Sequence, residues 1–149
     1  MLRKAKLTDA KDIQKLSKLF AERGEMLPRS LIQIYENIRD FVVAVKDNTL
    51  IGVCALHVTW ENLAEVRTLA VLEEYHRTGI GKMLVDSCLQ EARDLEIQHV
   101  FALTYKPEFF KKQGFSIIDK SELPHKVWQD CLNCAKFPDC DEIAMRIDL

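Results

Sequence analysis

The feature that most constrains the fold is a short apolar strand that runs into a glycine-bearing turn and then directly into an amphipathic helix. The strand ends at Val71, the turn contains Gly79 and Gly81, and the helix extends to about Leu95. Glycine removes the side chains that would hold a ligand away from backbone amides. The first amides of a helix lack partners within the helix and lie at the positive end of its dipole, so the turn predicts an anion site suited to pyrophosphate. An ordinary turn that needs glycine for packing is the alternative interpretation.

Length and charge exclude several classes of protein. The chain has 149 residues, which suits one domain with a proper core, and we expect a single domain over residues 1–149. A net charge of -2 argues against a protein that coats nucleic acid. No apolar run approaches the roughly 20 residues of a membrane span, and the N-terminus lacks the long apolar segment of a signal peptide. Five cysteines, an odd number, fit a reducing cytoplasm.

Periodicity and turn residues predict a mixed α/β (α+β) chain. Strands are expected over residues 2–6, 41–45, 50–59, 63–71, 99–103, 115–118 and 143–147. Helices are expected between a cap at Thr8 or Asp9 and Gly24, from a Ser30–Gln33 capping box to about Ile38, from Gly79 to about Leu95, and from Pro107 to Gly114. Residues 123–130 form a further candidate helix. The order is β-α-α-β-β-β-α-β-α-β-β, with an antiparallel meander over residues 41–71.

This order, with the glycine turn after the fourth strand, resembles the GNAT family of N-acetyltransferases over essentially the whole chain. The coenzyme A motif of that family, Arg/Gln-x-x-Gly-x-Gly/Ala, is matched by residues 76–81, except that His76 stands at the first position. A second signature, an aromatic-rich helix that ends in Gly-Phe, is matched by residues 109–115. The resemblance implies the GNAT fold, with a mixed central sheet and a β-meander, and acetyl-CoA as the cosubstrate.

A narrower resemblance is to the acetyltransferase domain of N-acetylglutamate synthases. It rests on residues 25–30, 54–56, 65–71, 101–104 and 122–124. In that family the domain makes N-acetylglutamate, the first step of arginine biosynthesis, and many members carry an amino-acid-kinase domain before it. The present chain resembles the short, stand-alone type. The resemblance therefore implies an acyltransferase that acetylates the α-amine of L-glutamate by direct transfer.

The resemblance also implies which residues hold the cosubstrate. It places the pyrophosphate on the backbone amides from Arg77 to Lys82, and Arg77 is expected to supply the cation that His76 does not. It places the pantetheine arm as a pseudo-strand beside Leu69 and Val71, where a backbone N–H faces the thioester oxygen and stabilises the developing oxyanion. Thr78 has an alternative role, which is to cap the following helix. The expected contacts are Leu69, Val71, His76, Arg77, Thr78, Gly79, Ile80, Gly81 and Lys82.

Acetyl transfer to an amine needs a base, because an α-amine is mostly protonated at neutral pH. Glu65, on the strand next to the cosubstrate, is the first candidate and would act through water; a solvated or salt-bridged carboxylate is the alternative. His57 on the neighbouring strand is a rival base or a satisfied, half-buried histidine. Many relatives use a tyrosine as general acid where this chain has Phe110. Tyr105, or solvent, would then protonate the departing thiolate.

A dicarboxylate acceptor needs cations. The resemblance implies glutamate contacts at Leu27, Arg29 and Thr68, and Arg67 on the central strand adds a charge that would be costly to bury unpaired. The synthases have a second arginine and a serine before the last strand, where this chain has the acidic residues 139–142. Arg67 would have to replace the lost cation, or else Lys136 or Arg3. Without a replacement, the acidic run favours another amine, such as a peptide N-terminus or a polyamine.

The cysteines raise the question of a metal. Cys54 and Cys88 lie in apolar patterns and are expected to be reduced core residues. Cys131, Cys134 and Cys140, with His125, suggest zinc, but a structural site needs four ligands and the second paired knuckle is missing, so we predict no metal site.

The alternative from another functional class is a non-catalytic module that binds acyl-CoA or a metal, which the missing general acid supports. The expected partner is a small amino-acid acceptor, with no nucleic acid and no membrane, and a homodimer stays open.

Overall fold

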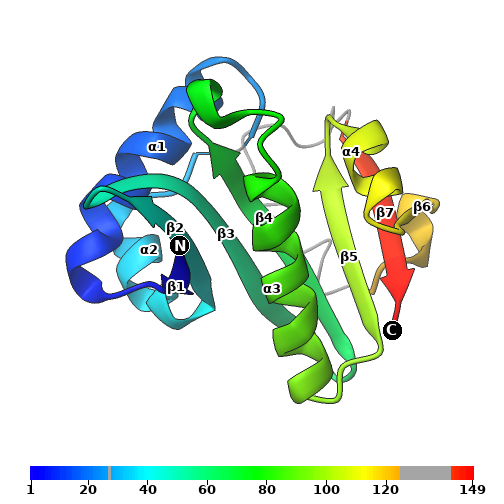
Figure 1. The fold of residues 1–149 in the computed structure, drawn as a ribbon. Helices are drawn as coiled ribbons and strands as arrows, with labels where there is room; N and C mark the ends of the chain where they lie inside the picture. Colours follow the sequence, from blue (N-terminus) through cyan, green and yellow to red (C-terminus); the bar gives the residue numbers. More distant parts are fainter. Residues whose placement is uncertain (27, 125–141) are drawn as a thin grey trace.

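The computed structural model describes residues 1–26, 28–124 and 142–149. A seven-stranded mixed sheet has the order β1-β2-β3-β4-β5-β7-β6, and helices cover both of its faces (Figure 1). The predicted α/β class and the predicted order of elements are confirmed. The strands are β1 (Leu2–Lys4), β2 (Phe41–Lys46), β3 (Thr49–Trp60), β4 (Leu63–Val71), β5 (His99–Thr104), β6 (Ser116–Ile117) and β7 (Ile143–Asp148). The helices are α1 (Ala10–Glu22), α2 (Leu31–Glu36), α3 (Ile80–Asp94) and α4 (Pro107–Lys112).

Local turn and cap residues set the limits of most elements. Asp47 and Asn48, between β2 and β3, have φ of 52° and 63°, and aspartate and asparagine are the side chains that best accept this left-handed backbone. The capping box before α2 is present as predicted: Gln33 N–H donates to the Ser30 hydroxyl and Ser30 N–H donates to the Gln33 side chain. The predicted helix over residues 123–130 begins at Leu123, which is not helical, and continues outside the described residues.

Alternation along the central strands divides the core into two layers. In β3, Cys54 and Leu56 belong to the cluster under α3, whereas Val53 and Ala55 belong to the cluster under α1 and α2. Both layers are closed by apolar side chains, so the sheet is buried on both faces over its centre.

The sequence spacing predicts one apolar stripe for α1, formed by Ile13, Leu16, Leu19 and Phe20, and the structure confirms three of these four positions. Ile13, Leu16 and Phe20 are buried, but Leu19 is 46% exposed. The inward position next to Leu16 is taken by Ser17, whose hydroxyl donates to the Gln14 carbonyl. The face that α1 buries is therefore the i, i+3, i+4, i+7 face, from which Leu19 is turned away.

The two described cysteines are free thiols, as predicted. Cys54 of β3 and Cys88 of α3 are both buried. The pKa of Cys54 is raised well above its usual value, mainly by the hydrogen bond with the Cys88 thiol and also by burial. A thiol with a raised pKa in an apolar layer is a poor nucleophile, which fits a packing role.

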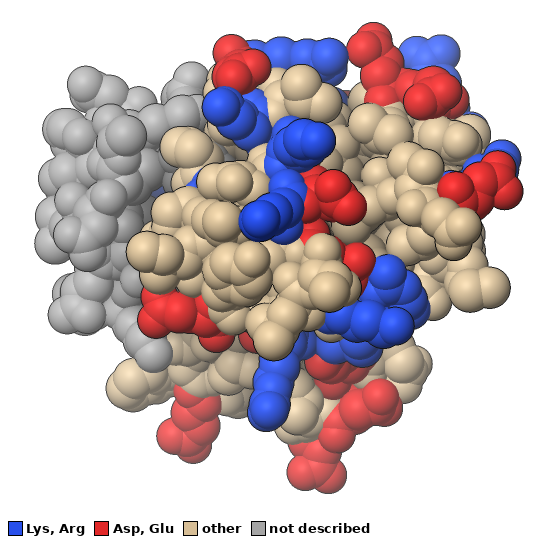
Figure 2. All heavy atoms as spheres, turned by 90° about the vertical axis from the view of Figure 1, so that its left-hand side faces the viewer, with Lys and Arg blue, Asp and Glu red and all other residues tan. Residues whose placement is uncertain are grey.

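The described part of the chain has no helix that could cross a membrane. None of the helices there is both long and apolar enough to span a bilayer. On the face shown in Figure 2, lysine and arginine side chains alternate with aspartate and glutamate side chains and do not merge into one basic patch.

An ion pair joins the first strand to the start of α1. The Arg3 guanidinium donates to both carboxylate oxygens of Asp9, at 2.7 and 3.0 Å, and Lys6 N–H donates to Asp9 at 2.7 Å. The predicted side-chain cap at Asp9 is wrong for α1, because this carboxylate turns back to Lys6 and Arg3 instead. The hydrogen bonds from Arg3 lower the pKa of Asp9 below its usual value.

We expect Asp9→Asn to lower the free energy of unfolding by about 1.5–3 kcal/mol near neutral pH, because a charge-assisted, bidentate contact is lost. Since the folded-state pKa of Asp9 is depressed, its contribution is complete above the unfolded pKa of about 3.9 and is lost as the pH falls through the folded value. The difference between parent and variant in urea unfolding should therefore shrink on acidification below about pH 4. Asp12→Asn, at an exposed carboxylate on the same helix, is the control.

Candidate active site

The site begins where β4 and β5 separate. These parallel strands pair only from Leu63↔His99 to Glu65↔Phe101, and Figure 1 shows them diverging beyond that point. A cleft of about 430 Å³ lies along the unpaired part of β4. Its walls come from α1, β4, the glycine turn, β5 and α4. A strand edge facing such a cleft offers backbone N–H and C=O groups to a ligand with amide groups.

A bulge in β4 sits at the middle of this cleft. Ala55 of β3 pairs with Arg67 and Val53 pairs with Ala70, so Thr68 and Leu69 together oppose one residue of β3. Thr68 has φ of 58°, a conformation that β-branched residues rarely adopt, and its side chain is buried. The bulge takes these two backbone units out of the regular ladder, on the strand where the sequence predicts the oxyanion contact.

The two predicted glycines have different physical roles. Gly79 precedes the first residue of α3 with φ of 88°, which side chains disfavour. Gly81 lies in a tight place, because a Cβ there would lie 3.3 Å from the Phe109 ring, which would have to shift slightly. Both line the cleft together with Arg77 and Lys82, so the start of α3 forms one end of it. For Gly81, both predicted roles therefore hold together: it packs closely against a neighbouring side chain, and it lies in the wall of the cleft predicted to bind the ligand.

Two predicted cosubstrate residues make internal hydrogen bonds. The His76 ring contacts the Val71 carbonyl through Nε2 at 2.7 Å and packs against Phe20. His76 thereby covers a backbone acceptor at the end of the strand that was expected to pair with the cosubstrate. The Thr78 hydroxyl donates to the Tyr75 carbonyl and does not cap α3, so the capping alternative is wrong. Leu69, Val71 and His76 line the cleft, whereas Thr78 and Ile80 do not.

The predicted acceptor residues meet around a second, smaller cavity of about 50 Å³. Arg29 from the loop before α2 and Arg67 and Thr68 from β4 all line it. Arg67 and Thr68 also line the cleft, so the two spaces share a wall. The proposed substitute Arg3 is bound to Asp9 and lines neither space, and Leu27 and Lys136 lie outside the described residues. The other lining residues are Gln33, Ile34, Asn37, Asp40, Phe41 and Ala55.

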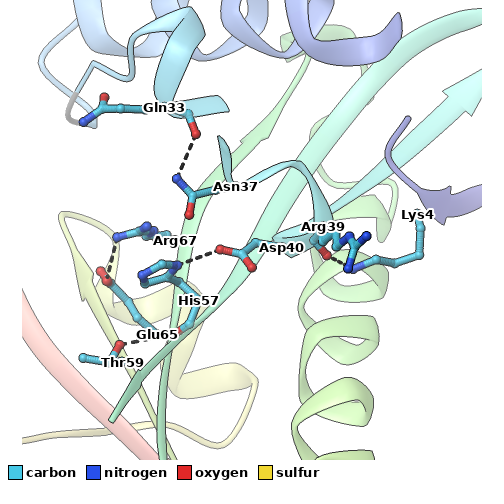
Figure 3. A network of polar contacts seen from close by, with 9 residues as sticks. All are labelled: Lys4, Gln33, Asn37, Arg39, Asp40, His57, Thr59, Glu65 and Arg67. Atoms are coloured by element: carbon cyan, nitrogen blue, oxygen red, sulfur yellow. Dashed lines mark hydrogen bonds and ion pairs between the residues drawn. The ribbon is translucent and has the colours of Figure 1, made fainter. Parts of the chain in front are cut away.

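A network of polar side chains lies beside this cavity (Figure 3). Glu65 Oε1 lies 3.6 Å from Arg67 Nη1, and His57 Nδ1 lies 2.6 Å from Asp40 Oδ2. Both pairs are largely shielded from solvent, with side-chain exposures between 15% and 29%. Glu65 lines neither the cleft nor the cavity, and its contact with a bound amine through water stays a prediction. Tyr105 likewise lines neither space, although its neighbours Thr104 and Lys106 line the cleft.

The sequence analysis did not identify several cleft residues. Glu25, in the turn that follows α1, has a buried carboxylate oxygen without a hydrogen-bond partner, 4.0 Å from Lys106 Nζ. Glu142 is 8% exposed and also lines the cleft. Glu25 lies within the segment that resembles the synthases, and Glu142 ends the acidic run. The remaining unpredicted residues are Phe20, Met26, Val66, Tyr75, Leu103, Thr104, Phe109, Phe110 and Lys112.

Within the described residues, no three histidine, cysteine, aspartate or glutamate side chains are grouped closely enough to hold a metal ion. The zinc hypothesis concerned His125, Cys131, Cys134 and Cys140, all of which lie outside the described residues. The described residues do not test the zinc hypothesis.

Comparisons with known proteins place this chain among acetyltransferases. The sequence profile of the acetyltransferase (GNAT) family matches residues 8–115. An uncharacterised N-acetyltransferase of Chlorobaculum tepidum is 44% identical over 97% of this chain and 93% of the relative. An amino-acid acetyltransferase of Mycobacterium tuberculosis is 36% identical over 87% of this chain and 76% of the relative. N-acetylglutamate synthase of Neisseria gonorrhoeae, solved with coenzyme A and N-acetylglutamate, superposes with a TM-score of 0.92 at 26% identity, over 100% of this chain and 35% of that one.

We expect Arg77→Asn to weaken the binding of coenzyme A, the cosubstrate predicted from the sequence, about tenfold or more, because a phosphate loses a charge-assisted contact. Asparagine tolerates the left-handed backbone of residue 77, where φ is 64°, so the fold should survive. Titration calorimetry measures the affinity, and Arg93→Asn in the last turn of α3 is the control. Equal affinity in parent and Arg77→Asn would remove this side chain from the cosubstrate site.

Proposed function

Because this chain belongs to the acetyltransferase (GNAT) family, we propose that it transfers the acetyl group of acetyl-CoA to the α-amine of L-glutamate or of a closely similar amino acid. The observation that carries the proposal is the meeting of Arg29, Arg67 and Thr68 around one small cavity that shares a wall with the cleft. Guanidinium groups bind carboxylates in a bidentate, orienting manner. Two of them beside an amine-accepting cleft suit an acidic amino acid.

The relatives support the choice of acceptor. Proteins similar to this chain are amino-acid acetyltransferases, and one of the similar solved structures holds coenzyme A and N-acetylglutamate. On this basis we propose a place in arginine biosynthesis. The free thiols Cys54 and Cys88 are consistent with a reducing cytoplasm.

The proposed chemistry follows from the order of groups along the cleft. The diphosphate of acetyl-CoA binds at the start of α3, where Arg77, Lys82 and the first helix amides provide positive charge. The pantetheine arm lies along the open edge of β4, and a backbone N–H at the bulge, at Thr68 or Leu69, faces the thioester oxygen and stabilises the oxyanion. Holding the amine beside the thioester supplies much of the acceleration.

The proton transfers involve the groups beside the acceptor cavity. Glu65 removes a proton from the α-ammonium group through a water molecule, and the neutral amine attacks the thioester carbonyl. The carbon–sulfur bond then breaks, and coenzyme A leaves as a thiolate that solvent or Tyr105 protonates. Because Phe110 occupies the place where many relatives have a tyrosine, and because Tyr105 does not line the cleft, we favour solvent.

Glu142 favours a second candidate acceptor. This carboxylate is buried in the wall of the cleft, at the end of the acidic run that replaces the second arginine of the synthases. A negative charge there disfavours a second carboxylate and favours an acceptor with a neutral or cationic side chain, such as an amide-bearing amino acid, a peptide N-terminus or a polyamine.

A panel of acceptors tests the proposal. Release of coenzyme A thiol would be followed with glutamate, glutamine, aspartate, lysine, a polyamine and a short peptide, each at equal concentration. Highest kcat/KM with glutamate or aspartate supports the proposal, whereas preference for glutamine, lysine, the polyamine or the peptide supports the second candidate. Coenzyme A binding without turnover on any acceptor would favour the non-catalytic module.

Arg29→Ala is expected to raise the KM for glutamate about tenfold to a hundredfold with a smaller change in kcat, because a carboxylate contact present in both ground and transition states is worth roughly 1.5–3 kcal/mol. The KM for acetyl-CoA should stay near that of the parent. Glutamine separates the two carboxylates: it loses affinity in the variant only if Arg29 holds the α-carboxylate. An unchanged glutamate KM would contradict the assignment of Arg29.

Glu65→Gln is expected to lower kcat about 10²–10⁴-fold while the affinity for coenzyme A stays unchanged, because the amide cannot take up the proton of the ammonium group. The pH dependence of kcat in the parent and in the variant is the informative measurement. If Glu65 is the base, an acidic limb present in the parent is absent from the variant. A near-normal rate at every pH would remove Glu65 from this role.

A further inference from the structure

We propose that Asp40 and His57 form a proton relay behind Glu65, so that His57 returns Glu65 to its carboxylate form after each transfer. This inference rests on the proposed function, in which Glu65 takes the proton of the acceptor amine. It assigns a task to a histidine–aspartate pair that the chemistry described above does not use.

The first observation is the contact between His57 and Asp40. His57 Nδ1 lies 2.6 Å from Asp40 Oδ2, which is a short charge-assisted hydrogen bond. A neutral imidazole in this contact donates Nδ1–H to the carboxylate, and Nε2 is then the acceptor nitrogen. Asp40 therefore fixes both the orientation and the tautomer of the ring.

The second observation is the position of Glu65 relative to this ring. His57 of β3 and Glu65 of β4 are direct register partners in an antiparallel pair, so their side chains leave the sheet on the same face a short distance apart. Figure 3 shows the His57 ring between the carboxylates of Asp40 and Glu65, with Arg67 beside them. Among the described residues, the charged groups around the ring are Asp40 from the turn before β2, and Glu65 and Arg67 from β4.

The third observation is the location of this group relative to the acceptor cavity and to solvent. Asp40 and Arg67 both line the small cavity, so the network adjoins the place where the amine would bind. The His57 side chain is 29% exposed and that of Glu65 is 15% exposed. The ring is thus closer to bulk water than the base that it would serve.

The proposed step is balanced in protons and charge. The protonated Glu65 carboxyl gives its proton to His57 Nε2, so an O–H bond breaks and an N–H bond forms. Glu65 becomes a carboxylate again, and the imidazolium is stabilised by the Asp40 carboxylate. His57 then releases a proton to water, which restores the starting state without any change of oxidation state. His57 acts through Glu65 and is a positioning residue.

Two substitutions separate this role from a structural one. In His57→Asn the amide nitrogen stands close to the place of Nδ1 and can still donate to Asp40, but nothing replaces Nε2. In Asp40→Asn the new amide can donate to Nδ1, which moves the ring proton to Nε2 and leaves the wrong tautomer. Each variant should lower kcat about tenfold or more and change the acceptor KM by less than about threefold. Melting temperatures should stay close to that of the parent for His57→Asn.

A double-mutant cycle with Glu65→Gln gives the sharpest test. If His57 acts through Glu65, adding His57→Asn to Glu65→Gln should slow the enzyme no further, within about threefold. Fully multiplicative losses would overturn the relay. A normal kcat in His57→Asn would also overturn the relay. So would a normal kcat in Glu65→Gln together with a large loss in His57→Asn, because His57 would then be the base itself.

The chain provides a matched control. His99 Nδ1 lies 2.7 Å from Asp148 Oδ1 in a second imidazole–carboxylate pair, at the start of β5 and away from the cleft. His99→Asn should leave kcat unchanged. All assays would use the best amino acid of the acceptor panel. If the parent is active and His57→Asn is unaffected, the relay alone is contradicted. If the parent is inactive on every amino acid, the proposed function is contradicted. If His57→Asn melts early, Asp40→Asn decides.

Discussion

The limited pairing between β4 and β5 is the constraint on which the rest of this structure depends. The two strands share three register pairs and then separate, so a wedge opens inside what is otherwise a continuous sheet. The cleft in this wedge is bordered by the bulge on one strand, the last residues of the other, and the helices that follow each of them. A sheet with regular pairing along the whole of β4 would have no backbone edge to offer and no cleft.

The bulge solves a second geometric problem. Strand alternation would place Arg67, Leu69 and Val71 on one face, but the extra residue changes the phase, so that Glu65 and Arg67 share a face with Ala70 instead. The charged side chains therefore face the layer of α1 and α2, where the acceptor cavity lies. Each of these charges has a partner nearby, Glu65 beside Arg67 and the His57 ring in hydrogen-bond contact with Asp40, which limits the cost of placing them where water is scarce.

The sequence predicted the features that depend on neighbouring residues better than those that depend on contacts between distant parts of the chain. The Ser30–Gln33 capping box is local, so its residues alone were enough to predict it. The bulge was not predictable, because a threonine at positive φ contradicts its own preference and is held there by the surrounding sheet. The contact between Asp40 and His57 was missed for another reason: it depends on the register of β2 and β3, which no local pattern specifies.

The contact between the glycine turn and α4 has a consequence for how this protein can vary. The Phe109 ring lies so close to Gly81 that a Cβ at this position would be 3.3 Å from it. A larger residue at position 81 would collide with the ring, and a smaller residue at position 109 would leave a void under the turn. The two positions are therefore energetically coupled, although 28 positions separate them along the chain. Among homologous sequences, changes at these sites should appear as compensating pairs, and a library that varies only one of them would sample mainly impaired variants.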